Sequence, residues 1–377
     1  MGRPAICKHF DDLPDPRVRG RCDHDLVDII VISVLAVICG ADGWQDIHEF
    51  ASVRETWLRG FLTLSNGIPG VDNRRVFAAL EPEAFHRCFL SWVQEAMQGS
   101  GSKLVAIDGK TARGSFAKED DKKALHLVSA WCAVNNLVLG QIATRAKSNE
   151  ITAIPELLEL LDLRGATVTI DAMGCQTAIA EKIVDAGADY VLGLKGNHPT
   201  LSKEVRDFFA LDQHNGCSET LHDTNETVDA GHGRIEVRRV TASDDIGWLE
   251  GSANWKGLKC IVMVESERTA NEQTSMERRF YLSSLPADAA LLGDRIRGHW
   301  GIENSLHWVL DMAFDEDRCR IRRRNAPDNF ALLRKIAVNL LKREKTSKRG
   351  IEGKRKRAGW DPAYLLTVLD AATSTGG

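Results

Sequence analysis

Two aspartates stand where buried strands are predicted to end. The run Leu104-Val-Ala-Ile107 is apolar and is followed at once by Asp108, and Ala166-Thr-Val-Thr-Ile170 is followed in the same way by Asp171. Strands that are covered on both faces are apolar throughout rather than alternating, so both runs indicate buried strands. A carboxylate at such a position is held rigidly, as a metal ligand must be. A third acid, Glu303, lies on a segment with helical spacing, and we interpret the three acids as ligands of a divalent metal ion.

The chemistry that suits three converging carboxylates is metal-dependent cleavage of a phosphodiester. Carboxylates at close range raise one another's pKa, and a bound Mg²⁺ or Mn²⁺ relieves that conflict. Two ions about 3.5–4 Å apart can activate an attacking hydroxyl and stabilise the leaving oxygen. Taken singly, an Asp after a strand is more often a turn former or a helix cap, and a Glu on a helix is more often an ion-pair partner.

The helical segment around Glu303 offers a second reading of the site. His299, Glu303, His307 and Asp311 are four residues apart, which places them on one helix face. The two histidines and the glutamate could bind zinc instead of magnesium. No cysteine or third histidine is obviously placed to close a zinc shell, so we favour the magnesium interpretation.

The elements that position these acids are predicted to form a mixed α/β sheet flanked by helices. Apolar spacing is helical from Asp25 to about Leu62, with a stop at Gly40, and Pro82 opens a helix through Met97. After a linker at 98–102 come strand runs, a hairpin turn at 135–136, a helix at 152–161, a helix at 176–186 and a strand at 190–194. Residues 217–285 read as a β-rich insertion. Helices are expected at 289–314 and 329–342, and residues 350–359 look too charged to fold without a partner. The predicted domains are 1–100 (helical), 101–215 (core, first part), 216–286 (β-rich insertion), 287–345 (core, last helices) and 346–377 (basic tail).

Charge and cysteine usage narrow the class of protein. The net charge is −4, yet residues 318–357 contain sixteen bases and three acids, a local balance of +13. Such a segment is suited to binding a polyanion, although a solvated basic tail would explain the charge equally well.

The nine cysteines include no Cys-x-x-Cys pair, which favours reduced thiols in the cytoplasm. The longest apolar run, Ile29–Ala41, is too short to span a bilayer, and no cleavable signal pattern opens the chain, so no membrane partner is expected.

Several motifs match one known family over nearly the whole chain. The chain resembles the ISAs-type, or H-repeat-associated, insertion-sequence transposases, which are DDE recombinases with an RNase H-like core. The motifs are His9-Phe-Asp-Asp-Leu-Pro-Asp-Pro16, Cys39-Gly-Ala-Asp-Gly-Trp44, Val105-Ala-Ile-Asp-Gly-Lys110, Thr169-Ile-Asp-Ala-Met-Gly174, Leu194-Lys-Gly-Asn197, Gly231-His-Gly-Arg-Ile-Glu236 and His299-Trp-Gly-Ile-Glu-Asn-Ser-Leu-His-Trp308.

The resemblance implies a function and a set of partners. Asp108, Asp171 and Glu303 would be the catalytic acids, holding two Mg²⁺ or Mn²⁺ ions. The expected activity is DNA transposition: cleavage at transposon ends, followed by strand transfer into target DNA. The expected partners are double-stranded DNA, namely terminal inverted repeats and target, and a second copy in a homodimer on paired ends. The expected location is the bacterial cytoplasm, with the nucleoid. A catalytically inactive relative that only binds DNA, or a nuclease without strand transfer, are the alternatives.

The sequence departs from the family at two places. Broader relatives carry Tyr, Arg and Lys around the glutamate, where this chain has Ile296, His299 and Leu310, so phosphate contacts must come from other residues. The segment Val71–Arg75 is one residue shorter than in relatives, a change that could weaken DNA recognition by the helical domain while sparing the acids.

Basic and polar side chains near the predicted site are candidates for contact with DNA, since phosphate contacts supply most of the affinity. A solvated surface charge is the alternative for each. Trp248 and Trp255 could stack on an unpaired base, although burial in a core is the favoured reading. The candidates for DNA contact are Lys110, Arg113, Lys195, Asn197, Arg234, His299, His307, Arg320 and Arg322.

Overall fold

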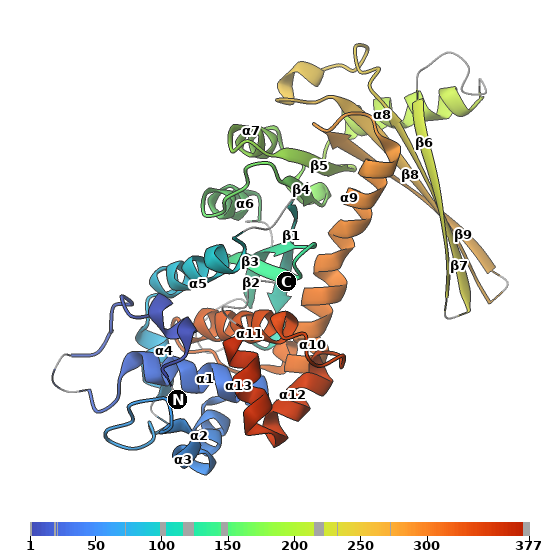
Figure 1. Ribbon diagram of the computed structural model, residues 1–377. Helices are drawn as coiled ribbons and strands as arrows, with labels where there is room; N and C mark the ends of the chain where they lie inside the picture. Colours follow the sequence, from blue (N-terminus) through green and yellow to red (C-terminus); the bar gives the residue numbers. More distant parts are fainter. Residues whose placement is uncertain are drawn as a thin grey trace. The chain divides into compact units, whose positions relative to one another are not determined.

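The computed structural model (Figure 1) divides the chain into two compact units, each built from segments far apart in the sequence. Unit 1 comprises residues 1–100, 109–149 and 303–377, and unit 2 comprises residues 101–108 and 150–302. The chain therefore passes between the units four times, and two of these crossings fall directly after Asp108 and directly before Glu303. The structure describes residues 2–18, 20, 22–71, 73–98, 103–115, 124–144, 150–214, 222–231, 233–271 and 273–371.

Strands and helices together make a mixed α/β protein, which confirms the predicted class. In unit 2 the hydrogen-bonded strands follow the order β1-β4-β5-β9-β8-β7-β6, and in unit 1 the order is β1-β2-β3. Strand β1 contributes to both, because residues 104–108 belong to unit 2 and residues 109–112 to unit 1. The nine strands in the described residues are β1 (Leu104–Ala112), β2 (Leu125–Cys132), β3 (Leu137–Thr144), β4 (Thr167–Ile170), β5 (Asp189–Leu194), β6 (His222–Gly231), β7 (Arg234–Ser243), β8 (Cys260–Ala270) and β9 (Gln273–Ser283).

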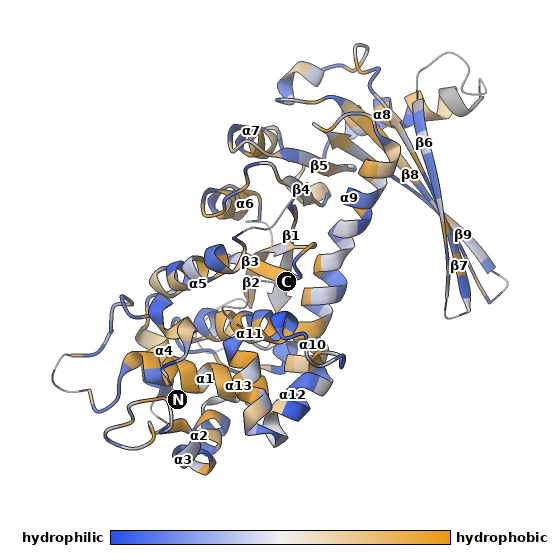
Figure 2. Cartoon of the chain, in the orientation of Figure 1, coloured by the Kyte–Doolittle hydropathy of each residue, from blue (hydrophilic) through white to orange (hydrophobic). Residues whose placement is uncertain are grey.

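Unit 1 is mostly helical, and its N-terminal helices begin and end near the predicted residues. The side chain of Asp25 caps α1 by accepting from two backbone N–H groups, and Gly40 ends the helix at a φ of 117°. Pro82 opens α5 in the first turn, where a missing N–H has no cost. Helix α1 is apolar along nearly its whole length (Figure 2), and almost all of its residues are therefore buried. The helices of unit 1 are α1 (Leu26–Cys39), α2 (Trp44–Val53), α3 (Glu55–Leu58), α4 (Asn73–Ala79), α5 (Pro82–Ala96), α10 (Trp308–Phe314), α11 (Ala326–Arg343), α12 (Ile351–Trp360) and α13 (Pro362–Asp370).

The basic C-terminal segment is folded, so the expectation that residues 350–359 need a partner to fold is wrong. They form most of α12, and two of its cations are buried. Lys354 Nζ donates to the carbonyl of Leu341 (2.8 Å) and pairs with Glu344 (3.2 Å). Arg355 donates to two carbonyls in the last turn of α1, at 2.9 and 3.3 Å. Carbonyls in the last turn of a helix lack some of their intrahelical hydrogen bonds, and a cation there also meets the negative end of the helix dipole.

The helices of unit 2 cover both faces of its parallel strands. Side chains alternate along a strand, so Ile170 and Thr169 of β4 point to opposite faces. Ile170 lies against Ile154 of α6 and the turn at Gly174, whereas Thr169 is hydrogen-bonded to His299 of α9. Helices α6 and α9 therefore lie on opposite sides of β4. The helices of unit 2 are α6 (Glu150–Glu159), α7 (Thr177–Asp185), α8 (Pro199–His214) and α9 (Ala289–Ile302).

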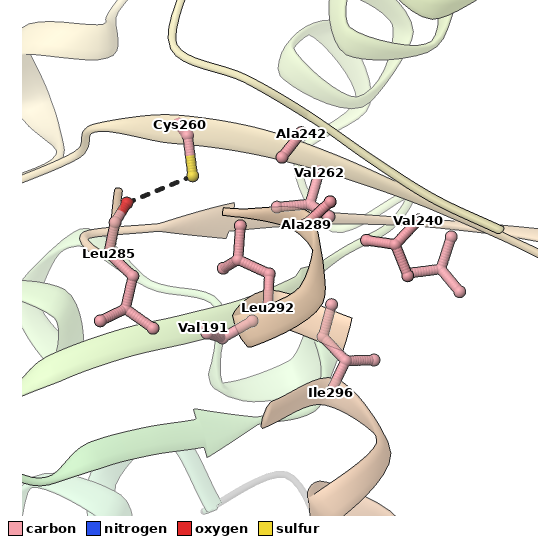
Figure 3. Packing of buried hydrophobic residues seen from close by; sticks show 10 residues of the cluster. Val191, Val240, Ala242, Cys260, Val262, Leu285, Ala289, Leu292 and Ile296 are labelled. Atoms are coloured by element: carbon pink, nitrogen blue, oxygen red, sulfur yellow. Dashed lines mark hydrogen bonds between the residues drawn. The ribbon is translucent and has the colours of Figure 1, made fainter. Parts of the chain in front are cut away.

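The predicted β-rich insertion forms two long hairpins that continue the sheet of unit 2. Strand β9 pairs antiparallel with β5, with Leu282 opposite Leu192. Figure 3 shows the core at this end, where Leu292 and Ile296 of α9 pack against Val240 of β7 and Val262 of β8. The first residues of β7 and β9 are exposed, and charged residues there interrupt the alternation of apolar and polar residues that is typical of a strand.

Three further expectations concern linkers, thiols and membranes. Most of the predicted linker at 98–102 and the segment 145–149 lie outside the described residues. The cysteines in the described part of the chain are free thiols, as predicted. No single helix in that part is long and apolar enough to cross a bilayer; α1 and α2 together reach the length, but a 96° bend separates them.

Candidate active site

Asp108 and Asp171 lie next to each other in unit 2. Strand β1 pairs in parallel with β4, with Ala106 opposite Thr169 and Ile107 opposite Ile170. Continued by one residue, this register sets Asp108 opposite Asp171, at the spacing of neighbouring strands, about 4.8 Å. The strand β4 ends before Asp171, as predicted. The strand β1 does not end at Asp108 but runs on to Ala112, because its second half belongs to unit 1.

Burial and neighbouring acids both act on the carboxyl group of Asp171. Burial raises its pKa, and the charges of Asp108 and Glu150 raise it further. A hydrogen bond from the Met173 N–H (3.0 Å) and the charge of His299 act in the opposite direction. The residue keeps solvent-exposed surface, so a ligand can reach it. Two neighbouring carboxylates with an unfavourable charge balance are a donor set that fits a divalent cation.

His299 is placed against the same strand. Its Nδ1 lies 3.0 Å from Thr169 Oγ1, so the two are hydrogen-bonded. Thr169 and Asp171 are two residues apart, so they share one side of the extended chain, and this explains why the charge of His299 lowers the pKa of Asp171. The sequence did not single out Thr169, because a threonine inside an apolar strand carries no chemical signature.

A close backbone approach and two side chains fix the turn that follows Asp171. A Cβ added at Gly193 of β5 would lie 3.1 Å from the Ala172 N, so a side chain there would press on the turn. Asn197 Nδ2 donates to the Ala172 carbonyl (2.6 Å), and His198 Nε2 lies 2.6 Å from the Cys175 carbonyl. Asn197, predicted to contact DNA, therefore also holds the loop that carries Asp171. Sequence reasoning missed Gly193 and His198.

Glu303 opens the last segment of unit 1, in a π turn. The predicted helix at 289–314 consists of α9, the π-helical residues Glu303–His307, and α10. The distance from Glu303 Oε2 to His307 Nδ1 is 3.8 Å. Glu303 is exposed, whereas His307 is buried. A π turn contains more residues than an α turn and is frequent at functional sites. It interrupts the regular four-residue spacing on which the predicted common face of His299, Glu303, His307 and Asp311 was based.

Lys110, predicted to contact DNA, lies among carboxylates of unit 1. Its Nζ lies 2.7 Å from Asp311, 3.4 Å from Asp317 and 3.5 Å from Glu316. Its side chain is only 11% exposed. The neighbouring candidate Arg113 is 83% exposed and lies 3.7 Å from Asp317. The two cations, three residues apart, therefore have different surroundings.

The other predicted DNA contacts are exposed residues of both units. In unit 2 they are Lys195, directly after β5, and Arg234, at the start of β7. In unit 1 they are Arg320 and Arg322, which follow α10, and Arg322 also donates to the Gly114 carbonyl (3.2 Å). Trp255 is buried, as favoured, whereas Trp248 is 39% exposed and stacks on Phe208.

Comparison with known sequences identifies the family. Residues 99–340 match the family described as "Transposase DDE domain", and residues 7–93 match the "DDE_Tnp_1-associated" family. The chain belongs to the Transposase DDE domain family. This confirms the resemblance drawn from the motifs.

Relatives of the Transposase DDE domain family match the chain from end to end. The candidate transposase YncI of Escherichia coli O157:H7 is 42% identical over 381 residues, covering 100% of this chain and 97% of its own length. The H repeat-associated candidate transposase YhhI of E. coli strain K12 is 39% identical over 375 residues and 98% of each chain. Among solved structures, a cryo-EM structure of the piggyBac transposase synaptic complex with hairpin DNA aligns with 95% of this chain and 75% of its own, at 10% identity and a TM-score of 0.42. A likeness that weak fixes neither fold nor function.

Proposed function

We propose that this member of the Transposase DDE domain family is a metal-dependent DNA transposase, with Asp108, Asp171 and Glu303 as metal ligands. The proposal is supported by two observations: Asp108 and Asp171 directly follow the paired residues Ile107 and Ile170 of neighbouring parallel strands, and the charge of Asp108 raises the pKa of Asp171. Two Mg²⁺ or Mn²⁺ ions bound there would activate an attacking hydroxyl and stabilise the leaving oxygen of a phosphodiester. Glu303, from unit 1, would be the third ligand.

The proposed reaction has two steps on DNA. Water first cleaves the phosphodiester at the transposon end and leaves a 3′ hydroxyl, and that hydroxyl then attacks a target phosphodiester. The protein's part is positioning, because Asp108 is held within a sheet strand and Asp171 by the turn at Ala172 that Asn197 ties down. His299, which Thr169 holds, is proposed to contact the phosphate near the acids, and His307 near Glu303.

Double-stranded DNA is the proposed partner. Exposed cations of both units are suited to phosphate, namely Arg113, Arg320 and Arg322 of unit 1 and Lys195 and Arg234 of unit 2. Each phosphate contact releases condensed counterions, so binding should weaken steeply with salt. We further propose an RNase H-like core that carries the acids and end recognition by helical residues 1–100. A homodimer on paired ends, in the bacterial cytoplasm with the nucleoid, completes the proposal.

The test is cleavage of a labelled DNA fragment that carries the sequence flanking the reading frame, where the terminal inverted repeats of a transposon would lie. The wild-type protein should nick this DNA with Mg²⁺ or Mn²⁺ and join the cut strand to a target plasmid. Asp171→Asn should reduce cleavage at least about a thousandfold, because a charged ligand is lost while binding surfaces remain. Asp207→Asn, an exposed substitution on α8, is the matched control and should leave cleavage unchanged.

Three outcomes separate the alternatives. If the protein binds this DNA but does not cleave it with Mg²⁺ or with Mn²⁺, the proposed enzyme activity is rejected. The protein would then be an inactive relative that only binds DNA. Cleavage without joined product would indicate a nuclease that lacks strand transfer. Equal activity of Asp171→Asn and wild type would reject the assignment of the acids.

A further inference from the structure

Lys110 is surrounded by negative charge of its own unit. The three carboxylates within 3.5 Å of its Nζ come from α10 (Asp311) and from the short 3-10 helix Glu316–Arg318 (Glu316 and Asp317). These contacts match the positive charge of Lys110 with carboxylates inside unit 1.

The cluster reaches into the core of unit 1. Glu316 is 1% exposed, and neither of its carboxylate oxygens has a hydrogen-bond partner in the described part of the chain. Burying a carboxylate costs free energy unless opposite charge lies nearby. Lys110 lies 3.5 Å from Glu316, and the charge of Glu316 also acts on Lys335. Lys335 is itself fixed by Ser129 (2.9 Å) and Gln141 (2.6 Å) of the β2–β3 hairpin.

The position of Lys110 in the chain links this cluster to the proposed catalytic acids. Lys110 follows Asp108 by two residues on the same strand, so the two side chains point to the same side of β1. Asp311 lies one helical turn after the π turn Glu303–His307. The ion pair Lys110–Asp311 therefore connects strand β1, which carries the proposed ligand Asp108, to helix α10. This helix directly follows the turn that carries the proposed ligand Glu303.

We propose that Lys110 is a positioning residue: its ion pairs hold α10, and with it the turn that carries Glu303 and His307, against strand β1. This role rests on the proposed function only in naming Glu303 as a ligand. It replaces contact with DNA as the role of Lys110, because a phosphate beside this ammonium would also lie beside three carboxylates. Arg113, exposed and three residues further on, is the better candidate for phosphate.

Hydrogen exchange measures the positioning role without any need for activity. In Lys110→Met, amides of residues 303–314 should exchange about tenfold faster or more, because the ion pair between Asp311 and β1 is lost. Amides in α5 and α13 should exchange as in the wild type. Lys110→Arg should restore slow exchange, since it keeps the charge. Arg113→Met is the matched control and should change exchange in no segment.

A second measurement separates positioning from contact with DNA. Lys110→Met should leave the salt dependence of DNA binding unchanged, whereas Arg113→Met should lower the slope of log K against log salt by about one. In the cleavage assay, Lys110→Met should raise the Mn²⁺ concentration for half-maximal rate, again with rescue by Lys110→Arg.

The proposal is overturned by unchanged exchange at 303–314 in Lys110→Met. It is also overturned by faster exchange spread evenly over unit 1, which would show a general loss of stability, or by a reduced salt slope in Lys110→Met. A wild-type protein that never cleaves DNA would reject the proposed function, while the exchange result would still decide the role of Lys110.

Discussion

Two groups of carboxylates in this protein differ in what balances their charge. In unit 1, Lys110 lies within 3.5 Å of Asp311, Glu316 and Asp317, and the charge of Glu316 also acts on Lys335. In unit 2, the charges nearest to Asp171 include two acids, Asp108 and Glu150, against the histidine His299. The first group contains its own cations, so it suits a structural role. In the second group, neighbouring acids raise the pKa of Asp171, a setting that suits an external cation.

The comparison predicts the largest effect for the buried cation of unit 1. Lys335→Met should lower the free energy of unfolding by about 3–5 kcal/mol, because removing one partner leaves buried charges uncompensated. Urea unfolding followed by circular dichroism measures this loss. Lys356→Met removes a lysine from an exposed ion pair on α12 and should change stability by less than about 0.5 kcal/mol. Equal effects of the two substitutions would contradict the structural role of the unit 1 cluster.

A medium effect is expected from added metal, through the proposed ligands and not through the carboxylates around Lys110. Mn²⁺ at about a hundred times its dissociation constant should stabilise the wild type by about 2.7 kcal/mol. Thermal unfolding with and without Mn²⁺ measures this as a rise in Tm. Asp171→Asn should abolish the rise, and Asp317→Asn, in the unit 1 cluster, should keep it. A rise that depends on Asp317 and not on Asp171 would reverse the assignment of the two groups.

The smallest effect is expected from Asp171 in the absence of metal. Its pKa is raised in the folded protein, so the folded state holds the proton more tightly and stability falls as pH rises through the range where Asp171 ionises. Asp171→Asn removes this penalty. It should stabilise the metal-free protein at pH 7 by a small amount, because solvent screens the charge of the partly exposed Asp171. The gain should vanish below the ordinary pKa of aspartate. Unfolding curves at several pH values would test it, and a gain that grows toward low pH would contradict the sign.

The sequence predicts elements whose signals are local. The stop at Gly40, the start at Pro82, the hairpin turn at 135–136 and the strand before Asp171 all follow from residues within a few positions. The surroundings of Asp171 could also be anticipated in part, because neighbouring parallel strands bring Asp108 beside it.

Contacts between residues far apart in the chain could not be predicted. Lys110 meets Asp311 across about two hundred residues, and Arg355 meets backbone carbonyls of α1 that no sequence pattern marks. For this reason the sequence predicts neither the ion pairs of Lys110 nor the folding of the basic residues of α12. The charge of residues 318–357 is partly internal, since Arg334, Lys335, Lys354 and Arg355 are buried.

The interrupted course of unit 1 has a consequence for synthesis of the protein. The α1 helix receives Arg355, and Asn329 of α11 donates to the Phe77 and Leu80 carbonyls at the end of α4. The N-terminal helices are synthesised first, but they therefore cannot complete these contacts until the C-terminal residues have been synthesised. Unit 2 ends at residue 302 and can assemble earlier. A copy of the gene with a stop codon before α11 would accordingly yield exposed apolar helices such as α1, and such a product would be prone to aggregation and degradation.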